Sequence, residues 1–167
     1  MQVRTRLFAD DGDIPNHARL PLIVYARAME PAADMATSFE HLFRSHGWSG
    51  TWRNGIFPFH HYHSTAHEVL GIAAGEAEVR FGGEAGETMR VRAGGAVLIP
   101  AGVGHKRLTA SPDLLVIGAY PAGQRADLMR EGAEDKAGIR ERIAEVPRPA
   151  TDPIVGAAGP MTRLWKK

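Results

Sequence analysis

The stretch FHHYHSTAHE, residues 59–68, holds four of the chain's eight histidines and ends in a glutamate, Glu68. An apolar run follows directly after Glu68. The chain has 167 residues and no cysteine, so any metal site must use nitrogen and oxygen ligands. In a β-strand, residues two apart share a face and lie roughly 6.6 Å apart along the strand. His61 and His63 therefore point the same way and can converge on one metal ion.

The third ligand of such a site is not fixed by alternation alone. If the strand ran straight on, His67 would share the face of His61 and His63. If residues 64–66 form a bend, Glu68 can turn inward instead. Two imidazoles and one carboxylate would then make a ligand set with open positions for a substrate.

A fourth candidate ligand comes later, in GGAVLIPAGVGHKRL, residues 94–108. His105 follows an apolar run and a turn rich in glycine, and such a turn can return a distant strand to the same pocket. His60 and His67 are interpreted as groups that support the ligands or lie at the surface.

The composition excludes several classes of partner. Lys and Arg together number 20 and Asp and Glu 19, which gives a net charge of +1 and no electrostatic reason to expect nucleic acid or an anionic membrane. The start, MQVRTRLFADDG, has no apolar core of a secretory signal, and no apolar run approaches membrane-spanning length. We therefore expect a cytoplasmic protein whose partner is a small molecule.

Residues 55–120 form a series of short apolar runs broken by glycines, with one run about every 8–12 residues. That rhythm predicts an all-β sandwich or barrel. In EAEVRF, residues 76–81, buried-type and charged residues alternate as in a half-buried strand. We expect one domain in three parts: an N-terminal strand and helix packing on the barrel (1–54), the barrel core (55–120), and a C-terminal helix and extended arm (121–167).

The first flank carries a helical pattern in DMATSFEHLFRSHGW, residues 34–48, where apolar residues recur at helical spacing. Thr37 and Glu40 fit a capping box, and Gly47 fits a helix stop. PLIVYARAM, residues 21–29, predicts a short buried strand.

The second flank predicts a helix over residues 136–146 and then an extended arm rich in proline and glycine. Leu164 and Trp165 form an apolar pair near the end of the arm. Such a pair is unfavourable in water, so we expect a docked terminus, for which a dimer contact is one position.

Over residues 55–120 the sequence resembles the cupins, in particular the small single-domain bacterial cupins. The first cupin motif, G-x5-H-x-H-x3,4-E-x6-G, is matched at every spacing by Gly55, His61, His63, Glu68 and Gly75. The second motif, G-x5-P-x-G-x2-H-x3-N, is matched by Gly94, Pro100, Gly102 and His105, while Thr109 replaces the final Asn.

The resemblance implies a double-stranded β-helix, a jelly-roll barrel with the metal inside its mouth, and the local patterns add flanking N-terminal and C-terminal helices. It also implies His61, His63, Glu68 and His105 as metal ligands, and favours Glu68 over His67 because Gly75 then falls at the right distance. Cupin barrels commonly pair through outer sheet faces, so the resemblance further implies a homodimer.

Such a ligand set suits a divalent transition metal, and Fe, Mn, Zn, Ni, Cu and Co are all compatible with it. We expect a metal-dependent enzyme of dioxygenase or isomerase type that acts on a small organic molecule in the barrel mouth. The alternative is a non-catalytic module that binds or senses a small ligand or the metal itself.

The walls of the pocket offer two further hypotheses. Arg107 has the parity of His105 and could neutralise a carboxylate on a substrate, although a place at the solvent-exposed rim is the simpler interpretation. Phe57 and Phe59 share the parity of His61, and they are interpreted as core residues rather than as residues that stack on a substrate. Further candidates for an apolar lining are Leu70, Ile72, Val79, Phe81, Met89 and Val91.

Overall fold

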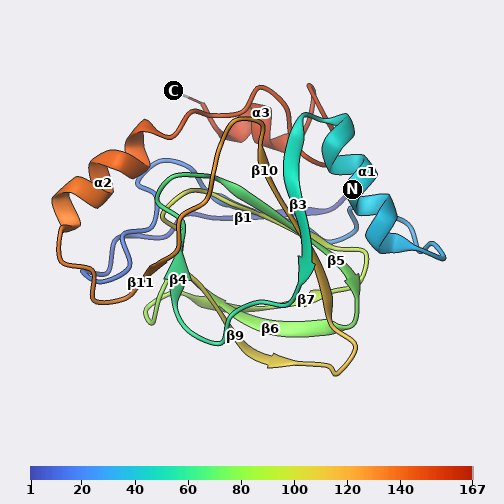
Figure 1. Ribbon diagram of the computed structural model, residues 1–167, viewed down its shortest axis with the longest axis horizontal. Helices are drawn as coiled ribbons and strands as arrows, with labels where there is room; N and C mark the ends of the chain where they lie inside the picture. Colours follow the sequence, from blue (N-terminus) through green and yellow to red (C-terminus); the bar gives the residue numbers. More distant parts are fainter. Residues whose placement is uncertain (167) are drawn as a thin grey trace.

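The computed structural model describes residues 1–166, which form two antiparallel sheets facing one another with three helices outside them (Figure 1). The helices are α1 (Met35–Ser45), α2 (Lys136–Glu145) and α3 (Pro160–Leu164). The strands are β1 (Val3–Arg6), β2 (Leu22–Tyr25), β3 (Trp48–Asn54), β4 (His61–Tyr62), β5 (Glu68–Ala74), β6 (Glu76–Phe81), β7 (Glu87–Arg92), β8 (Ala96–Ile99), β9 (His105–Ala110), β10 (Leu115–Pro121) and β11 (Met129–Arg130).

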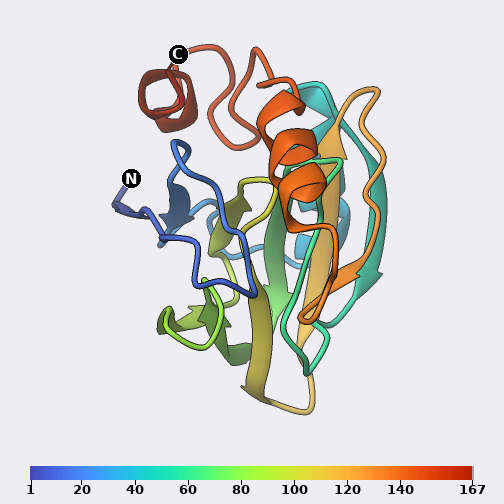
Figure 2. The same ribbon diagram turned by 90° about the vertical axis from the view of Figure 1, so that its left-hand side faces the viewer.

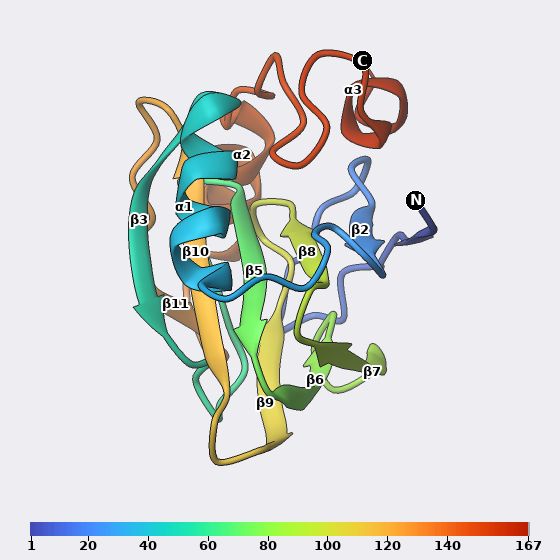
Figure 3. The ribbon, with the colours of Figure 1, turned by 90° about the vertical axis from the view of Figure 1, so that its right-hand side faces the viewer.

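One sheet has six strands in the order β1-β2-β8-β5-β10-β3, and the other has five in the order β11-β4-β9-β6-β7. Figure 3 shows β3, β10, β5, β8 and β2 side by side. This is the jelly-roll barrel expected from the sequence. The barrel extends beyond residues 55–120, because β1, β2 and β3 complete one sheet and β11 extends the other.

The core between the sheets follows from alternation along the strands. On β6, Ala77, Val79 and Phe81 are buried, while the charged residues between them face outward. Ile72 on β5 and Met89 on β7 join the same cluster. Each such large apolar side chain contributes about 1.5–3 kcal/mol when fully buried.

Helix α1 covers the outer face of the six-stranded sheet, as Figure 3 shows. Phe39 and Phe43 are fully buried there, and a Cβ at Gly71 would lie 2.6 Å from the Phe39 ring, so only glycine allows this approach. The predicted capping box is wrong, because Asp34 is the N-cap and accepts the N–H of Thr37 at 3.1 Å. The predicted stop is confirmed at Gly47, which has a φ of +79°.

The C-terminal arm is fastened by a buried carboxylate. Asp152 is fully buried and accepts the hydroxyl proton of Tyr25 on β2 at 2.6 Å. It also accepts the backbone N–H groups of Ile154, Val155 and Met161. This one carboxylate therefore satisfies backbone N–H groups in the turns of the arm and also fastens the arm to the sheet.

The terminus itself docks through one residue of the predicted pair. Trp165 is 4% exposed and donates its indole N–H to the Pro21 carbonyl, whereas Leu164 is 41% exposed. The expectation of a docked terminus is therefore confirmed for Trp165, while Leu164 does not dock on its own chain and the dimer contact stays a prediction.

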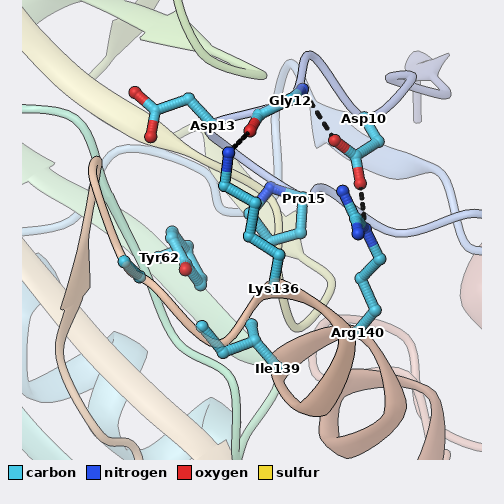
Figure 4. Close-up of a pocket in the computed structure, with 9 residues that line it drawn as sticks. Asp10, Gly12, Asp13, Pro15, Tyr62, Lys136, Ile139 and Arg140 are labelled. Atoms are coloured by element: carbon cyan, nitrogen blue, oxygen red, sulfur yellow. Dashed lines mark hydrogen bonds and ion pairs between the residues drawn. The ribbon is translucent and has the colours of Figure 1, made fainter.

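Helix α2, the orange helix facing the viewer in Figure 2, is held against the N-terminal loop. Figure 4 shows how this is done: Arg140 pairs with Asp10 at 2.5 Å, and Lys136 donates to the Gly12 carbonyl. Ile139 packs beside Tyr62 of β4 in a small apolar cluster. No helix described for residues 1–166 is long and apolar enough to cross a membrane.

Candidate metal centre

The centre is built where the two sheets face one another. In the five-stranded sheet, His61 on β4 lies directly opposite His105 on β9. The chain then bends through residues 63–67 and crosses to the other sheet, where Glu68 begins β5. The bend resets the alternation, so Glu68 faces the histidines across the barrel, as the cupin resemblance implies.

Three of the four predicted ligands meet closely. One ligand atom each from His63, Glu68 and His105 lies within 4.8 Å of the other two. The Glu68 Oε1 atom is 3.3 Å from His63 Nε2 and 3.5 Å from His105 Nε2. A metal bound at about 2.1 Å holds adjacent ligand atoms about 3 Å apart, so these separations fit one shared ion.

His61 lies beside this cluster rather than within it. Its ring centroid is 4.0 Å from that of His105 and 6.0 Å from that of His63, and it lines the same cavity. The structure therefore brings all four residues to one cavity, with three of them at ligand-to-ligand distances.

Each of the three histidines is oriented by a backbone carbonyl. A carbonyl oxygen only accepts, so each Nδ1 carries a proton and Nε2 is the ring nitrogen left to bind a metal. The bonds are His61 Nδ1 to the Phe59 oxygen (2.9 Å), His63 Nδ1 to the Asp127 oxygen (2.5 Å) and His105 Nδ1 to the Val103 oxygen (3.1 Å).

Without a metal, the charges in the cluster are set by burial and by Glu68. Burial alone would raise the pKa of Glu68, but His63 and His105 hold it well below its usual range, so the carboxylate is ionised. For His63, burial lowers the pKa but is outweighed by the Glu68 charge and hydrogen bond, which raise it to about 9. In the metal-free protein the His63 cation therefore balances the Glu68 carboxylate, and a bound metal ion would replace the His63 proton.

Three other buried histidines are held neutral, and for each of them burial is the main cause. The pKa of His61 falls to about 3, with repulsion from His105 contributing. The pKa of His67 falls to about 3 and that of His17 to about 4. We refer to His17, His61 and His67 as the neutral histidines.

The ligands open onto a cavity of about 250 Å³. Its wall is mostly aromatic and aliphatic, and Tyr120 adds a hydroxyl that accepts the Trp52 indole N–H at 2.8 Å. Burial and the nearby Glu68 charge raise the pKa of Tyr120, so its hydroxyl stays protonated. The lining residues are Trp52, Asn54, Gly55, Ile56, Phe57, His61, His63, Glu68, Leu70, His105 and Tyr120.

The expectation that Phe57 and Phe59 are core residues is wrong for Phe57, which lies at the rim of the cavity. Phe57 lines the cavity and is 47% exposed, so it is not a core residue. It stacks on Phe59 with ring centroids 5.0 Å apart, and Arg130 covers the Phe59 ring at 3.8 Å. Arg107 does not line the cavity, and its Nε donates to the Ile56 carbonyl at 3.0 Å.

The expected apolar lining is confirmed for one residue. Leu70 contacts the cavity. The remaining candidates pack in the core cluster between the sheets: Ile72, Val79, Phe81, Met89 and Val91.

The segment after β10, residues 122–130, holds the His63 loop in place, and we call it the strap. The Asp127 carboxylate accepts the backbone N–H of Ser64 at 2.6 Å and contacts the Ser64 hydroxyl. Thr65 donates its hydroxyl to the Arg125 carbonyl at 2.6 Å. Sequence reasoning missed the strap because its key contact to His63 is a backbone carbonyl, which any residue type can supply.

Tyr120 was also missed, since it ends a strand that reads as apolar on both faces. A single hydroxyl-bearing residue at the end of an aliphatic strand was the one indication the sequence contained.

His60 and His67 are outside the cavity. His60 Nε2 lies 2.6 Å from a Glu84 carboxylate oxygen, and His67 Nδ1 accepts the Ala101 N–H at 2.8 Å. This agrees with the expectation that neither is a ligand.

Comparison with known proteins gives one close relative in sequence. No protein-family model matches the chain. It is 42% identical over 166 residues to the uncharacterised protein YjlB of Bacillus subtilis strain 168, an alignment that covers 99% of this chain and 98% of the relative.

Solved structures give weaker likenesses. A DUF861 family protein of Thermotoga maritima is 23% identical over 56% of this chain and 94% of its own, with a TM-score of 0.34. Acireductone dioxygenase from Bacillus anthracis, with a cadmium ion in its active centre, is 12% identical over 75% of this chain and 82% of its own, with a TM-score of 0.41. Both scores are low, so the fold assignment depends on the motifs and strand order of this chain.

Proposed function

The chain belongs to the same family as YjlB of Bacillus subtilis and has the cupin fold, and we propose that it is a metal-dependent enzyme acting on a small organic molecule in the barrel mouth. One observation carries the proposal. Two buried histidines and the half-buried His63, each with Nδ1 bonded to a carbonyl, line one cavity together with an ionised glutamate.

The residues that would hold the metal are His61, His63, Glu68 and His105. Three imidazoles and one carboxylate suit Fe, Mn, Co, Ni, Cu or Zn, and leave two positions open on a six-coordinate ion, or one if Glu68 binds through both oxygens. When bound, such an ion supplies Lewis acidity and, if redox-active, a place for dioxygen chemistry.

The chain's own residues define what can enter. Apart from the proposed ligands, the wall consists of aromatic and aliphatic groups with Asn54 and Tyr120. The apolar surface desolvates a bound molecule, and the amide and hydroxyl orient it. Tyr120 accepts from Trp52, which leaves its own proton available to Glu68 or to an oxygen of the bound molecule.

This wall favours a largely apolar substrate and an oxygenase over an isomerase. An isomerase that moves a proton needs a positioned base in the cavity, and the side chains of the wall offer a protonated hydroxyl, an amide and an indole instead. The reaction would then depend on the metal, while the wall supplies shape and one proton donor.

The test begins with elemental analysis of protein purified without chelator or a nickel column. Near-stoichiometric metal is expected in the native protein and in His41→Ala, which removes an exposed histidine of α1, and loss is expected in His63→Ala. Oxygen consumption with a panel of small aromatic and aliphatic enols and phenols then follows.

Metal with turnover of one panel member supports the enzyme. Metal with saturable ligand binding and no turnover would replace it with a binding or sensing module. Equal metal content in the native protein and His63→Ala would contradict the proposed site.

A further inference from the structure

A second binding region lies where three distant parts of the chain meet, and it shares no residue with the metal cavity. The loop before β2, the segment at the end of α2 and Lys166 line an open cavity of about 130 Å³. We call it the basic pocket, and its lining residues are His17, Arg19, Leu20, Ala144, Val146, Arg148 and Lys166.

Three cations line this small volume. Among residues 1–166, Arg19, Arg148 and Lys166 form no ion pair with a carboxylate. Arg148 donates instead to the Trp165 carbonyl at 3.3 Å. In a chain with a net charge of +1, such a cluster makes a local positive potential that favours an anion.

His17 adds a neutral donor whose orientation is fixed. Its Nδ1 accepts the backbone N–H groups of Arg19 at 3.1 Å and Leu20 at 3.0 Å, so the proton of the neutral ring is on Nε2. Burial, with the charges of Arg19 and Arg148, lowers its pKa to about 4, which keeps the ring neutral near pH 7. Its Nδ1 edge faces the backbone, so the Nε2–H edge is the one left for the cavity that His17 lines.

An apolar groove of about 710 Å³ adjoins the basic pocket and shares His17, Arg19 and Ala144 with it. The shared residues place the groove directly beside the cations. Its one carboxylate, Asp10, is already paired with Arg140. The apolar side chains of its wall are Leu7, Phe8, Ala9, Pro15, Ala18, Ile143 and Ala144.

We propose that the basic pocket binds the phosphate or carboxylate head of a small organic anion whose apolar body lies along the groove. The head would accept from His17 Nε2–H and be balanced by Arg19, Arg148 and Lys166. Charge-assisted hydrogen bonds of this kind are the strong ones, and the groove adds apolar contact. This site is independent of the proposed metal chemistry.

The probes are inorganic phosphate, hexyl phosphate and hexanoate, titrated calorimetrically into the protein as purified at constant ionic strength. His17→Asn is the sharpest variant, because the Asn oxygen can still accept at the place of Nδ1 while the Nε2 donor is lost. His17→Gln is its matched control, because its amide nitrogen can reach the place of Nε2. Arg148→Gln and Lys166→Gln remove cations, and Arg163→Gln removes an arginine of α3 outside the pocket.

The expected result is saturable, single-site binding that is tighter for a hexyl anion than for inorganic phosphate. His17→Asn and Arg148→Gln should weaken it by about tenfold. Lys166→Gln, at an exposed side chain that cannot threaten folding, should also weaken it, while His17→Gln and Arg163→Gln should bind within about twofold of the native protein. The tighter of hexyl phosphate and hexanoate identifies the head group.

Absence of saturation with all three probes would overturn the proposal. So would binding that His17→Asn, Arg148→Gln and Lys166→Gln leave unchanged, because the anion would then lie elsewhere. Equal affinity for phosphate and hexyl phosphate would overturn the assignment of the groove.

Discussion

Replacing Asp127 with alanine should weaken metal binding although this side chain is not a ligand. The carboxylate holds the Ser64 N–H at 2.6 Å and contacts its hydroxyl, while the Asp127 carbonyl orients the His63 ring at 2.5 Å. Two hydrogen bonds to a charged group are lost, each worth about 1.5–3 kcal/mol. Releasing the strap frees the His63 ring, and loss of such an orienting group typically costs about 10–100-fold in metal affinity.

The assay is competition between the protein and a fluorescent chelator for the metal found in the native protein. Asp127→Asn should fall between the native protein and Asp127→Ala, because its amide oxygen can still accept the Ser64 N–H. Asp113→Ala, at an exposed turn, is the matched control and should bind as the native protein does. Native affinity in Asp127→Ala, with the fold intact by circular dichroism, would refute the role given to the strap.

Three further predictions concern stability, each measured by denaturant unfolding. The metal-free protein should be most stable near pH 6.5. The raised pKa of His63 gives stability that is lost as pH rises through about 9. The lowered pKa values of the neutral histidines give stability that is lost as pH falls below 6.5, and each histidine changes the free energy of unfolding by about 1.4 kcal/mol per pH unit. A flat profile from pH 5 to 9 would contradict these charges. Asp152→Ala should cost roughly 3–5 kcal/mol, since Tyr25 and three backbone N–H groups lose a buried acceptor, and a loss below about 1 kcal/mol would show that the arm docks by other means. Gly118→Ala should cost about 1–3 kcal/mol, because its Cβ would lie 2.1 Å from the Trp52 ring, and an unchanged midpoint would mean that the ring moves freely.

The candidate ligands could be found from the sequence because their spacing is a property of strands. Alternation placed His61 and His63 on one face, and the motif spacing selected Glu68 after the bend. The structure brings these residues and His105 to one cavity. Alternation also identified β6, whose buried residues were predicted one by one.

The remaining strands depend on partners rather than on local pattern. Strand β1 has one half-buried and three exposed residues, so its sequence has no apolar face that would predict a strand. It forms because it pairs with β2. Strand β11 has only two residues and is fixed by pairing with β4. Short strands of this kind carry too little side-chain pattern to be read from sequence.

The helix start shows how two good local patterns compete. Both Thr37 and Asp34 are favoured capping residues, and each is followed three residues later by a partner. Asp34 prevails because its carboxylate accepts both the backbone N–H and the hydroxyl of Thr37, which starts α1 three residues earlier. Phe57 was misplaced because residues 55–60 are irregular, so strand parity does not apply to them.

The most direct test of the metal centre is anomalous X-ray diffraction at the absorption edge of the metal found by elemental analysis. The proposed site predicts one peak at about 2.0–2.3 Å from Nε2 of His61, His63 and His105 and from a Glu68 oxygen. A peak held by other residues, a peak with His61 turned away from it, or no peak in protein purified without chelator would contradict the four-ligand centre.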